Sequence, residues 1–159
     1  MNTKLLGALG AVALLAACGS GTEQSSAATG GGAETTASGP RPGSQEDLVA
    51  NIGDRVFFDT DRSSVRADQR TVLDRQAGWL QRYPQVQVAV EGHADERGTR
   101  EYNLALGQCR ANSARDVLVA GGVAAARIEV ISYGNDRPAS LGSNDQAWAQ
   151  NRRAVTLTR

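Results

Sequence analysis

The sequence has few of the residues that build metal centres or disulfide frameworks. Its 159 residues include two Cys and one His. A structural zinc ion takes four protein ligands, chiefly Cys and His, and a catalytic zinc ion takes three. His93, Asp95 and Glu96 lie close together in the chain, but not at the spacing of a helical H-E-x-x-H pair. The Cys count excludes a structural zinc site, and we predict no metal and no cofactor.

The sequence also lacks a hydrophobic run long enough to span a membrane. Its longest uninterrupted run of small and apolar residues covers residues 5–17, whereas a spanning helix needs about 20 apolar residues. Lys4 supplies a positive charge immediately before this run. A positive start followed by a short apolar stretch is typical of a secretory signal peptide, which we predict for residues 1–17.

Cys18 follows the predicted signal peptide directly. The tetrapeptide L-A-A-C at residues 15–18 resembles the lipobox of bacterial lipoproteins, which implies cleavage before Cys18 and acylation of its sulfur and amino group. Two or three acyl chains anchor a protein stably, whereas one binds only marginally. In the lipoproteins that this segment resembles, an Asp directly after the acylated Cys favours retention in the inner membrane. Gly19 stands at that position here, so we predict a lipid anchor in the outer membrane, at its periplasmic face. A chance Cys after an ordinary signal peptide is the alternative.

Lysine does not occur after residue 4. The chain that remains after the predicted cleavage carries 16 Arg against 17 acidic residues, a net charge of −1. A nearly neutral chain gives no reason to expect nucleic-acid binding or a basic membrane-binding patch. If Cys18 is acylated, Cys109 has no partner for an internal disulfide.

Residues 18–44 form a predicted flexible tether. Twenty of the 26 positions in residues 19–44 are Gly, Ser, Ala or Thr, and none carries a large apolar side chain. Such a segment cannot bury enough apolar surface to offset the entropy lost on ordering, and as a coil it spans roughly 30 Å. We therefore predict one folded domain at residues 45–159, which is long enough to have its own core.

Hydrophobic periodicity within residues 45–159 predicts an α+β fold. Apolar residues recur at three- and four-residue steps in residues 65–83, which indicates a helix, and alternate with polar residues in 85–91, which indicates a half-buried strand. The other predicted elements are a short helix from Ser44, strands at 55–59, 127–133 and 153–158, and helices at 100–120 and 145–151. We expect a two-layer α/β sandwich of strand-helix-strand-helix-strand-strand order, in which a small mixed sheet carries helices on one face.

The densest group of polar residues lies in residues 91–112, where a loop joins a predicted strand to a predicted helix. Asn103, Leu106 and Arg110 share one face of that helix, and an Arg side chain directed back along the helix approaches the loop bearing Asp95. An Asp carboxylate can bind an ammonium and an Arg fork can bind a carboxylate, so the pair could hold a small zwitterion. Spacing alone favours a simpler alternative, in which Asp95 and Arg110 pair with each other or with neighbours.

A Cys109–His93 dyad, with Asp95 as its orienting group, is an enzymatic alternative. Cys109, however, falls in the middle of the predicted helix, away from a helix N-terminus that would lower the pKa of its thiol. We expect Cys109 to be a half-buried small side chain and the protein not to be an enzyme.

Longer motifs in the same region carry a family resemblance. E-G-H-A-D-E-R-G-T at residues 91–99 precedes Y-N-x-x-L-G-x-x-R-A-N at residues 102–112, and V-F-F-D, S-Y-G and N-R-R-A-V occur at residues 56–59, 132–134 and 151–155. In this order, over nearly all of residues 55–158, the motifs closely resemble the OmpA-like peptidoglycan-binding family. The resemblance implies an OmpA-like fold, and the predicted signal, lipobox and tether fit lipoprotein members of that family.

The resemblance implies non-covalent binding of the peptide stem of peptidoglycan, chiefly its meso-diaminopimelate. By the family motif, Asp95 holds the ammonium of diaminopimelate and Arg110 holds its carboxylate. The other residues that the resemblance places around this ligand are Phe58, Asp59, Thr99, Asn103 and Leu106.

Five charged residues near the motif have weaker assignments. We expect His93, Glu96 and Arg97 to shape the loop or to face a partner. Arg152 and Arg153 are expected to brace the pocket or the sheet edge. The chain departs from the family at Cys109, where a charged residue is common, while the neighbouring Arg110 is kept.

For the whole protein, the resemblance implies an outer-membrane lipoprotein that links the membrane to the cell wall and supports envelope integrity and cell division. It also implies membership of the Tol system, with TolB and TolA as protein partners. Two alternatives remain: an envelope adaptor without affinity for peptidoglycan, and a wall-acting hydrolase, for which the sequence lacks a nucleophile or metal set.

Overall fold

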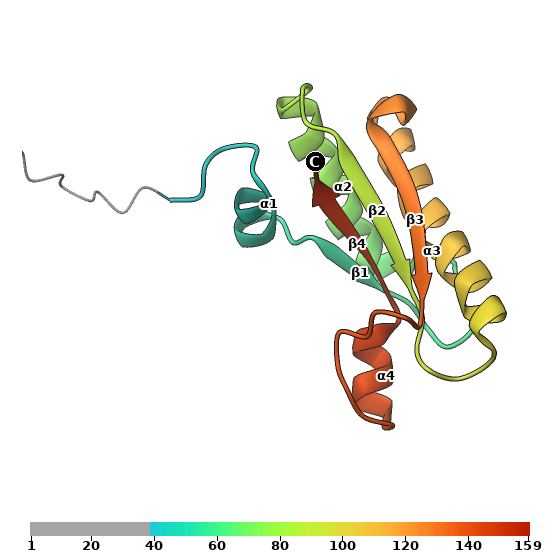
Figure 1. Cartoon of the computed structure of the whole chain (residues 1–159). Coiled ribbons are helices and arrows are strands. Elements are labelled where there is room, and N and C mark those ends of the chain that lie inside the picture. Colours follow the sequence, from blue (N-terminus) through green and yellow to red (C-terminus); the bar gives the residue numbers. More distant parts are fainter. Residues whose placement is uncertain (1–38) are drawn as a thin grey trace, which may run out of the picture. The chain divides into compact units, whose positions relative to one another are not determined.

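The computed structural model describes residues 39–159 (Figure 1). The predicted signal peptide, the predicted acylation site Cys18 and most of the predicted tether lie outside the described residues. Within residues 39–159, no helix has both the length and the hydropathy that crossing a membrane requires. The elements follow in the order α1 (Gln45–Asn51), β1 (Arg55–Phe57), α2 (Ala67–Arg82), β2 (Val88–His93), α3 (Arg100–Ala120), η1 (Ala125–Arg127), β3 (Ile128–Gly134), α4 (Asp145–Asn151) and β4 (Arg153–Thr158).

The four strands form one mixed sheet in the order β1-β4-β2-β3. β2 runs parallel to β3 and antiparallel to β4, and β1 pairs with β4 in the antiparallel sense. The parallel pair needs a crossover, which α3 supplies. In Figure 1, α2 and α3 lie together behind the sheet, so the predicted two-layer α+β architecture with helices on one face is confirmed.

The predicted ends of the helices and strands agree best with the structure where helix-capping residues are present. α3, α4 and β4 begin and end at the predicted residues. Thr99 caps α3 by accepting from the Tyr102 N–H, and Asn144 caps α4 by accepting from the Ala147 N–H. Gly122, at φ +91°, follows α3 in the left-handed conformation that favours Gly.

The prediction for β2 was wrong about which residues form the strand and about how deeply they are buried. The strand covers Val88–His93 rather than residues 85–91, because the chain first turns after α2, with the Val86 N–H donating to the Tyr83 carbonyl at 3.1 Å. It is almost fully buried rather than half-buried, since β4 and β3 flank it and α3 packs on one face. His93 therefore belongs to the strand and not to the loop that follows.

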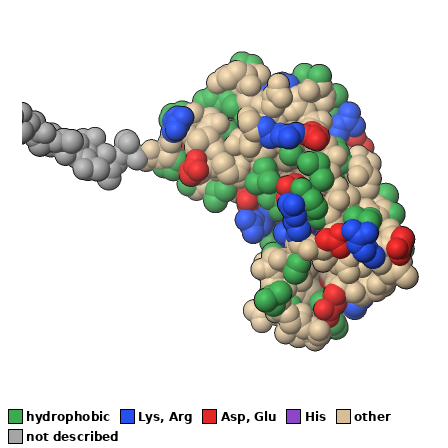
Figure 2. All heavy atoms as spheres, in the orientation of Figure 1, with side chains coloured by type: hydrophobic (Ala, Val, Ile, Leu, Met, Phe, Trp, Pro, Cys, Tyr) green, Lys and Arg blue, Asp and Glu red, His purple; other side chains and the backbone are tan. Residues whose placement is uncertain are grey.

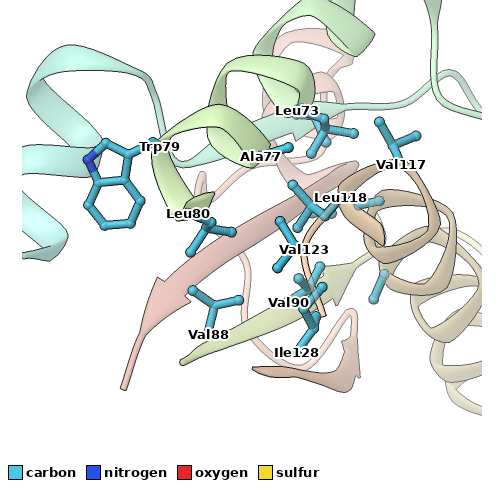
Figure 3. Close-up of a cluster of buried hydrophobic side chains, with 14 of the residues drawn as sticks. Leu73, Ala77, Trp79, Leu80, Val88, Val90, Val117, Leu118, Val123 and Ile128 are labelled. Atoms are coloured by element: carbon cyan, nitrogen blue, oxygen red, sulfur yellow. The ribbon is translucent and has the colours of Figure 1, made fainter. Parts of the chain in front are cut away.

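The hydrophobic core fills the space between α2, α3 and the sheet. Figure 3 shows Leu73, Ala77 and Leu80 from α2 directed toward side chains of α3 and of β2. A buried polar pair supplements this core: Gln76 donates to the Gly53 carbonyl at 2.7 Å and accepts from Thr156 at 2.8 Å. These bonds satisfy polar groups that burial would otherwise penalise.

Asp47 connects α1 to α2 through a hydrogen bond from Trp79. Its carboxylate accepts hydrogen bonds from the Trp79 Nε1, the Gly43 N–H and the Asn51 Nδ2, at 2.9, 2.9 and 2.7 Å. Ser44 caps the helix at the predicted position. The folded part of the chain therefore includes α1.

α3 approaches β2 at two glycines. A Cβ built on Gly92 of β2 would lie 1.9 Å from the Gly107 carbonyl oxygen of α3, and one built on Gly107 would lie 2.4 Å from the Ser132 hydroxyl oxygen. Helix and strand main chains can meet this closely only without side chains at both positions. This contact sets the position of α3, and of the loop before it, against the end of β2.

Gly92→Ala is expected to lower the free energy of unfolding by at least about 2 kcal/mol, because the added methyl group meets main-chain atoms that cannot rotate away. Gly78→Ala in α2 is the matched control. A Cβ at Gly78 meets nothing within 4 Å, so this change should stabilise the protein by up to ~1 kcal/mol. Urea unfolding of both variants measures the difference, and equal effects would show that α3 can shift away from β2 at little cost.

Candidate functional site

The candidate site lies at the junction of β2 and α3. The connecting loop, residues 94–99, meets a second loop, residues 58–64, that follows β1. The register of β2 against β3 shifts between Gly92 and His93, and the Ala94 N–H donates to the Gly134 carbonyl at 2.8 Å. Both loops are thus held at one end of the sheet, where loops on a rigid scaffold commonly carry function.

Asp95 is buried and accepts four hydrogen bonds. Its Oδ1 accepts from the Arg97 N–H and Nε, each at 3.1 Å, and its Oδ2 accepts from Arg97 Nη2 at 2.6 Å and Arg152 Nη1 at 3.2 Å. Burial alone would raise the pKa of Asp95, but the hydrogen bonds from Arg97 and Arg152 outweigh it and hold the pKa below its usual value. Asp95 is therefore a carboxylate at neutral pH.

Arg110 is fully buried, at 0% exposure. Its Nε, Nη1 and Nη2 donate to the main-chain carbonyls of Arg62, His93 and Asp59, at 2.8, 2.9 and 3.0 Å. Burial lowers its pKa to about 10, an effect that the nearby Asp95 charge partly opposes. The guanidinium remains charged at neutral pH and ties the loop after β1 and the end of β2 to α3.

A surface pocket of about 230 Å³ opens between the two loops and the start of α3. Its wall consists of Thr60, Asp61, Arg97, Gly98 and Tyr102. Two polar contacts cross it: Arg97 Nη2 donates to the Thr60 hydroxyl, and the Tyr102 hydroxyl donates to Asp61, each at 3.4 Å. The pocket thus lies directly beside the Asp95–Arg97 ion pair.

The residues that the resemblance placed around a ligand lie behind or beside this pocket wall. Phe58 is buried, with its ring 5.4 Å from the Arg110 guanidinium. Asp59 gives its carbonyl to Arg110, while its exposed side chain lies 3.4 Å from Arg66. Thr99 caps α3, and Leu106 is partly buried on the helix face shared with Arg110.

Asn103 and Arg152 hold the loop from two sides. The Asn103 Nδ2 donates to the Arg97 carbonyl at 3.0 Å. Arg152 donates to the Phe58 carbonyl at 3.1 Å as well as to Asp95, which is the bracing role expected of it. Arg153 donates to the carbonyls of Asn151 and Arg137 on the other side of β4. The contacts of Asn103 and Arg152 hold the loop and the carboxylate of Asp95 in place.

Sequence reasoning named none of the five wall residues as a ligand contact: Thr60, Asp61, Arg97, Gly98 and Tyr102. Arg97 had been assigned to loop shaping or to a partner contact, yet it pairs with Asp95 and lines the pocket. The spacing Asp95-Glu96-Arg97 contained the signal, because an Asp side chain commonly accepts from the N–H two residues on. That turn places the Arg fork on the carboxylate.

The Cys109–His93 dyad is contradicted by the structure. His93 is 2% exposed, and neither ring nitrogen has a hydrogen-bond partner. Cys109 is exposed rather than half-buried as predicted. The His93 ring instead stacks on Tyr133, with 5.7 Å between ring centroids. Without contact between imidazole and thiol, the dyad cannot activate a nucleophile.

Charges on the surface are mixed in sign. On the face shown in Figure 2, acidic and basic side chains alternate and often lie side by side. Within residues 39–159, no three His, Cys, Asp or Glu side chains gather as a metal site would require. The site is therefore defined by one buried carboxylate and three guanidinium groups, which suit recognition of a charged organic group.

The fold is a small mixed sheet with two helices on one face, and a charged pocket lies beside the loop that joins β2 to α3. The family model described as the OmpA family matches residues 57–152. The chain belongs to the OmpA family.

Individual proteins and solved structures also match this chain. A peptidoglycan-associated lipoprotein from Mesorhizobium japonicum is 54% identical over 153 residues, covering 94% of this chain and 88% of that protein. The crystal structure of the peptidoglycan-associated lipoprotein from Burkholderia pseudomallei matches with a TM-score of 0.67 and 39% identity, over 71% of this chain and 100% of that one. The C-terminal domain of Helicobacter pylori MotB, at 22% identity and a TM-score of 0.63, covers 67% and 84% and shares the fold.

Arg110→Met is expected to lower the free energy of unfolding by about 3 kcal/mol, because it leaves one buried and two part-buried main-chain carbonyls without their charged donor. Arg115→Met, in the same helix, is the control. Arg115 is partly exposed and lies 3.8 Å from Asp116, so its replacement should change stability by no more than about 0.5 kcal/mol. Denaturant unfolding compares the two, and similar losses would show that the three bonds contribute little.

Stability should also fall as the pH drops from about 6.5 to 4. Burial, then Arg153 and Arg137, lower the pKa of His93 from 6.5 to about 4, so in this range the unfolded chain takes up a proton that the folded chain refuses. The His93 contribution is complete above pH 6.5 and is lost toward pH 4, on the order of 3 kcal/mol.

Urea unfolding across this pH range, repeated on His93→Phe, isolates the effect, because Phe keeps the stack on Tyr133 and cannot titrate. The variant should lose less stability between pH 6.5 and 4. Since His93 is the only His in the chain, NMR of its ring reports the titration directly. A ring that titrates near pH 6.5 would contradict the prediction.

Proposed function

We propose that this protein is an outer-membrane lipoprotein whose domain at residues 45–159 binds the stem peptide of peptidoglycan non-covalently, through meso-diaminopimelate. One observation carries the proposal: a buried, charged Asp95 lies beside an open pocket, with the Arg110 cation behind it. The relatives named peptidoglycan-associated lipoprotein support the choice of ligand.

Asp95 is the proposed partner of the ligand ammonium. Its side chain is 9% exposed, so an ion pair formed there is largely shielded from water and from salt. Charge-assisted hydrogen bonds are about twice as strong as neutral ones. The bracing by Arg152 fixes the carboxylate before the ligand arrives, which reduces the entropy that binding would otherwise cost.

Arg110 is the proposed partner of the ligand carboxylate, as the family resemblance implies. Three of its five guanidinium N–H groups donate to main-chain carbonyls, which leaves two for a ligand. Because the side chain is fully covered, a direct contact requires residues 59–62 to move aside. Binding by Arg110 is therefore coupled to movement of the loop after β1.

The proposed anchor is Cys18, acylated after removal of residues 1–17, with residues 18–44 as the tether. A domain held to the membrane by acyl chains and to the wall by its pocket would link the two layers while allowing them to shift. By the same resemblance we propose that the protein acts in the Tol–Pal system, with TolB and TolA as partners, and supports envelope integrity and cell division.

The alternatives from other classes lack a supporting observation within residues 39–159. A wall-acting hydrolase needs an activated nucleophile or a metal, and the imidazole of His93 contacts neither Cys109 nor any other hydrogen-bond partner. The binding measurement described next separates the adaptor from the proposed function.

Asp95→Asn should weaken binding of a stem tripeptide ending in meso-diaminopimelate by about 30-fold, which is roughly 2 kcal/mol, because the ammonium loses its charged partner. Isothermal titration calorimetry of the full-length protein in detergent measures this affinity. The domain should stay folded, since Asn keeps the shape of Asp and can still accept from the Arg97 N–H.

Asp136→Asn is the matched control. Asp136 also forms a two-bond ion pair with an Arg near the start of α3, at 2.6 and 3.1 Å from Arg100, but it does not line the pocket. Its replacement should leave binding unchanged. If the unaltered protein gives no heat with the tripeptide, the adaptor alternative replaces the proposed function.

A further inference from the structure

α1 is the first folded element that a pull on the predicted tether would reach. The tether ends where α1 begins, and β1 and the loop at residues 58–64 follow α1 in the chain. Arg110 holds this loop through the carbonyls of Asp59 and Arg62. A load that enters at the tether therefore has one main-chain path to the pocket, which runs through α1, then β1, then the loop.

We propose that α1 is a detachable end of the tether, which comes off the domain under load before β1 and the pocket are disturbed. Its detachment lengthens the link and leaves the binding site intact. The proposal rests on the proposed function in one respect, since that function places a load between the tether and the pocket.

α1 rests on the domain through a narrow contact. Only Asp47 and Leu48 of this helix are buried. Leu48 joins the hydrophobic core, and Asp47 accepts from the Trp79 Nε1 of α2 at 2.9 Å. Figure 3 shows the Trp79 ring turned away from the side chains of α3, toward the ribbon of α1. Val49, by contrast, is 48% exposed, so one side of the helix faces solvent.

The side chain of Gln45 supplies the other attachment. β1 pairs with β4 only over Arg153–Val155. Beyond this pairing, the Gln45 amide accepts from the Thr158 N–H at 2.8 Å and donates to the Thr156 carbonyl at 3.2 Å. A side-chain amide thus replaces a further strand residue. It can be withdrawn by rotation about single bonds, whereas a paired strand must be pulled off by its main chain.

Once detached, α1 would not persist as a helix. It has seven residues, and isolated helices shorter than about 12–15 residues are marginal in water. Residues 45–54 would then extend to about 34 Å, at ~3.4 Å per residue. The folded helix is roughly 10 Å long, at ~1.5 Å per residue. The tether therefore gains roughly 20–25 Å from this segment.

β1 is held more firmly than α1. Val56 and Phe58 are 1% and 2% exposed. Besides the ladder with β4, the Phe58 N–H donates to the Arg152 carbonyl at 3.0 Å and the Phe57 N–H donates to the Gln69 Oε1 at 3.1 Å. β1 runs from α1 to the end of the sheet where the site lies (Figure 1). The load acts along the strand, so the bonds across it share the load instead of breaking singly.

Optical tweezers on the full-length chain test the order of release. The chain is made by cell-free translation without membranes, so that Cys18 keeps its thiol. DNA handles are attached at Cys18 and Cys109, the two Cys of the chain. Cys109 is exposed and precedes Arg110 in α3, so the pull acts between the tether and the helix behind the pocket. We expect a reversible first step of roughly 20–25 Å in contour length, and a second step at higher force.

Gln45→Ala should lower the force of the first step, because it removes both bonds to β4, and should leave the second step unchanged. Gln85→Ala is the matched control, since Gln85 is exposed and lies outside α1, and it should change neither step. Hydrogen exchange makes the same comparison without force. The amides of α1 should exchange about tenfold faster in Gln45→Ala, while those of β1 keep their rate.

A single step in which α1 and the sheet unfold together would overturn the proposal, as would α1 amides that exchange only as slowly as those of β1. The stem tripeptide ending in meso-diaminopimelate separates this proposal from the proposed function. Bound peptide should raise the force of the second step and not of the first. If it raises both, α1 and the pocket open together and the proposal is wrong. If it raises neither, the proposed function is wrong, and the early release of α1 stands.

Discussion

The site depends on one buried guanidinium. Arg110 joins α3 to the carbonyls of Asp59 and Arg62 after β1 and of His93 at the end of β2. It can reach all three because Gly92 and Gly107 let α3 lie against β2. A charge with no solvent contact must be satisfied by the protein, and main-chain carbonyls of the loop after β1 and of the end of β2 satisfy it here. In the empty site, the same bonds therefore hold the segment that carries the wall residues Thr60 and Asp61.

Around this fixed cation, Asp95 is fully engaged before any ligand arrives. Its four hydrogen bonds come from one braced Arg and one exposed Arg. Affinity for a ligand at such a carboxylate is a difference between the new contacts and those given up. A ligand ammonium would therefore have to replace hydrogen bonds that Asp95 already accepts.

Sequence patterns were sufficient for elements with strong local signals. α3 has Thr99 before it and a left-handed Gly after it, so its ends are set locally. The burial of β2 could not be predicted because it comes from neighbouring strands that are distant in sequence. Asp95 and Arg110 could be singled out by the family motif, but the pairing of Asp95 with Arg97 required the turn geometry. The exposure of Cys109 depended on which helix face packs, which the weak periodicity around it did not determine.

The two attachments of the proposed link, to the membrane and to the cell wall, would differ in how easily they come apart. Acyl chains on Cys18 would hold the membrane with ~0.8 kcal/mol per buried CH₂, which sums to far more than an exchange of ion pairs can supply. The empty pocket, in contrast, is already satisfied, since Arg97 and Arg152 donate to Asp95 when no ligand is bound. Under load the connection would therefore release at the wall rather than at the membrane, and it would re-form without leaving an unpaired charge behind. A reversible link of this kind requires a site whose empty state is already stable, and the saturated carboxylate of Asp95 provides one.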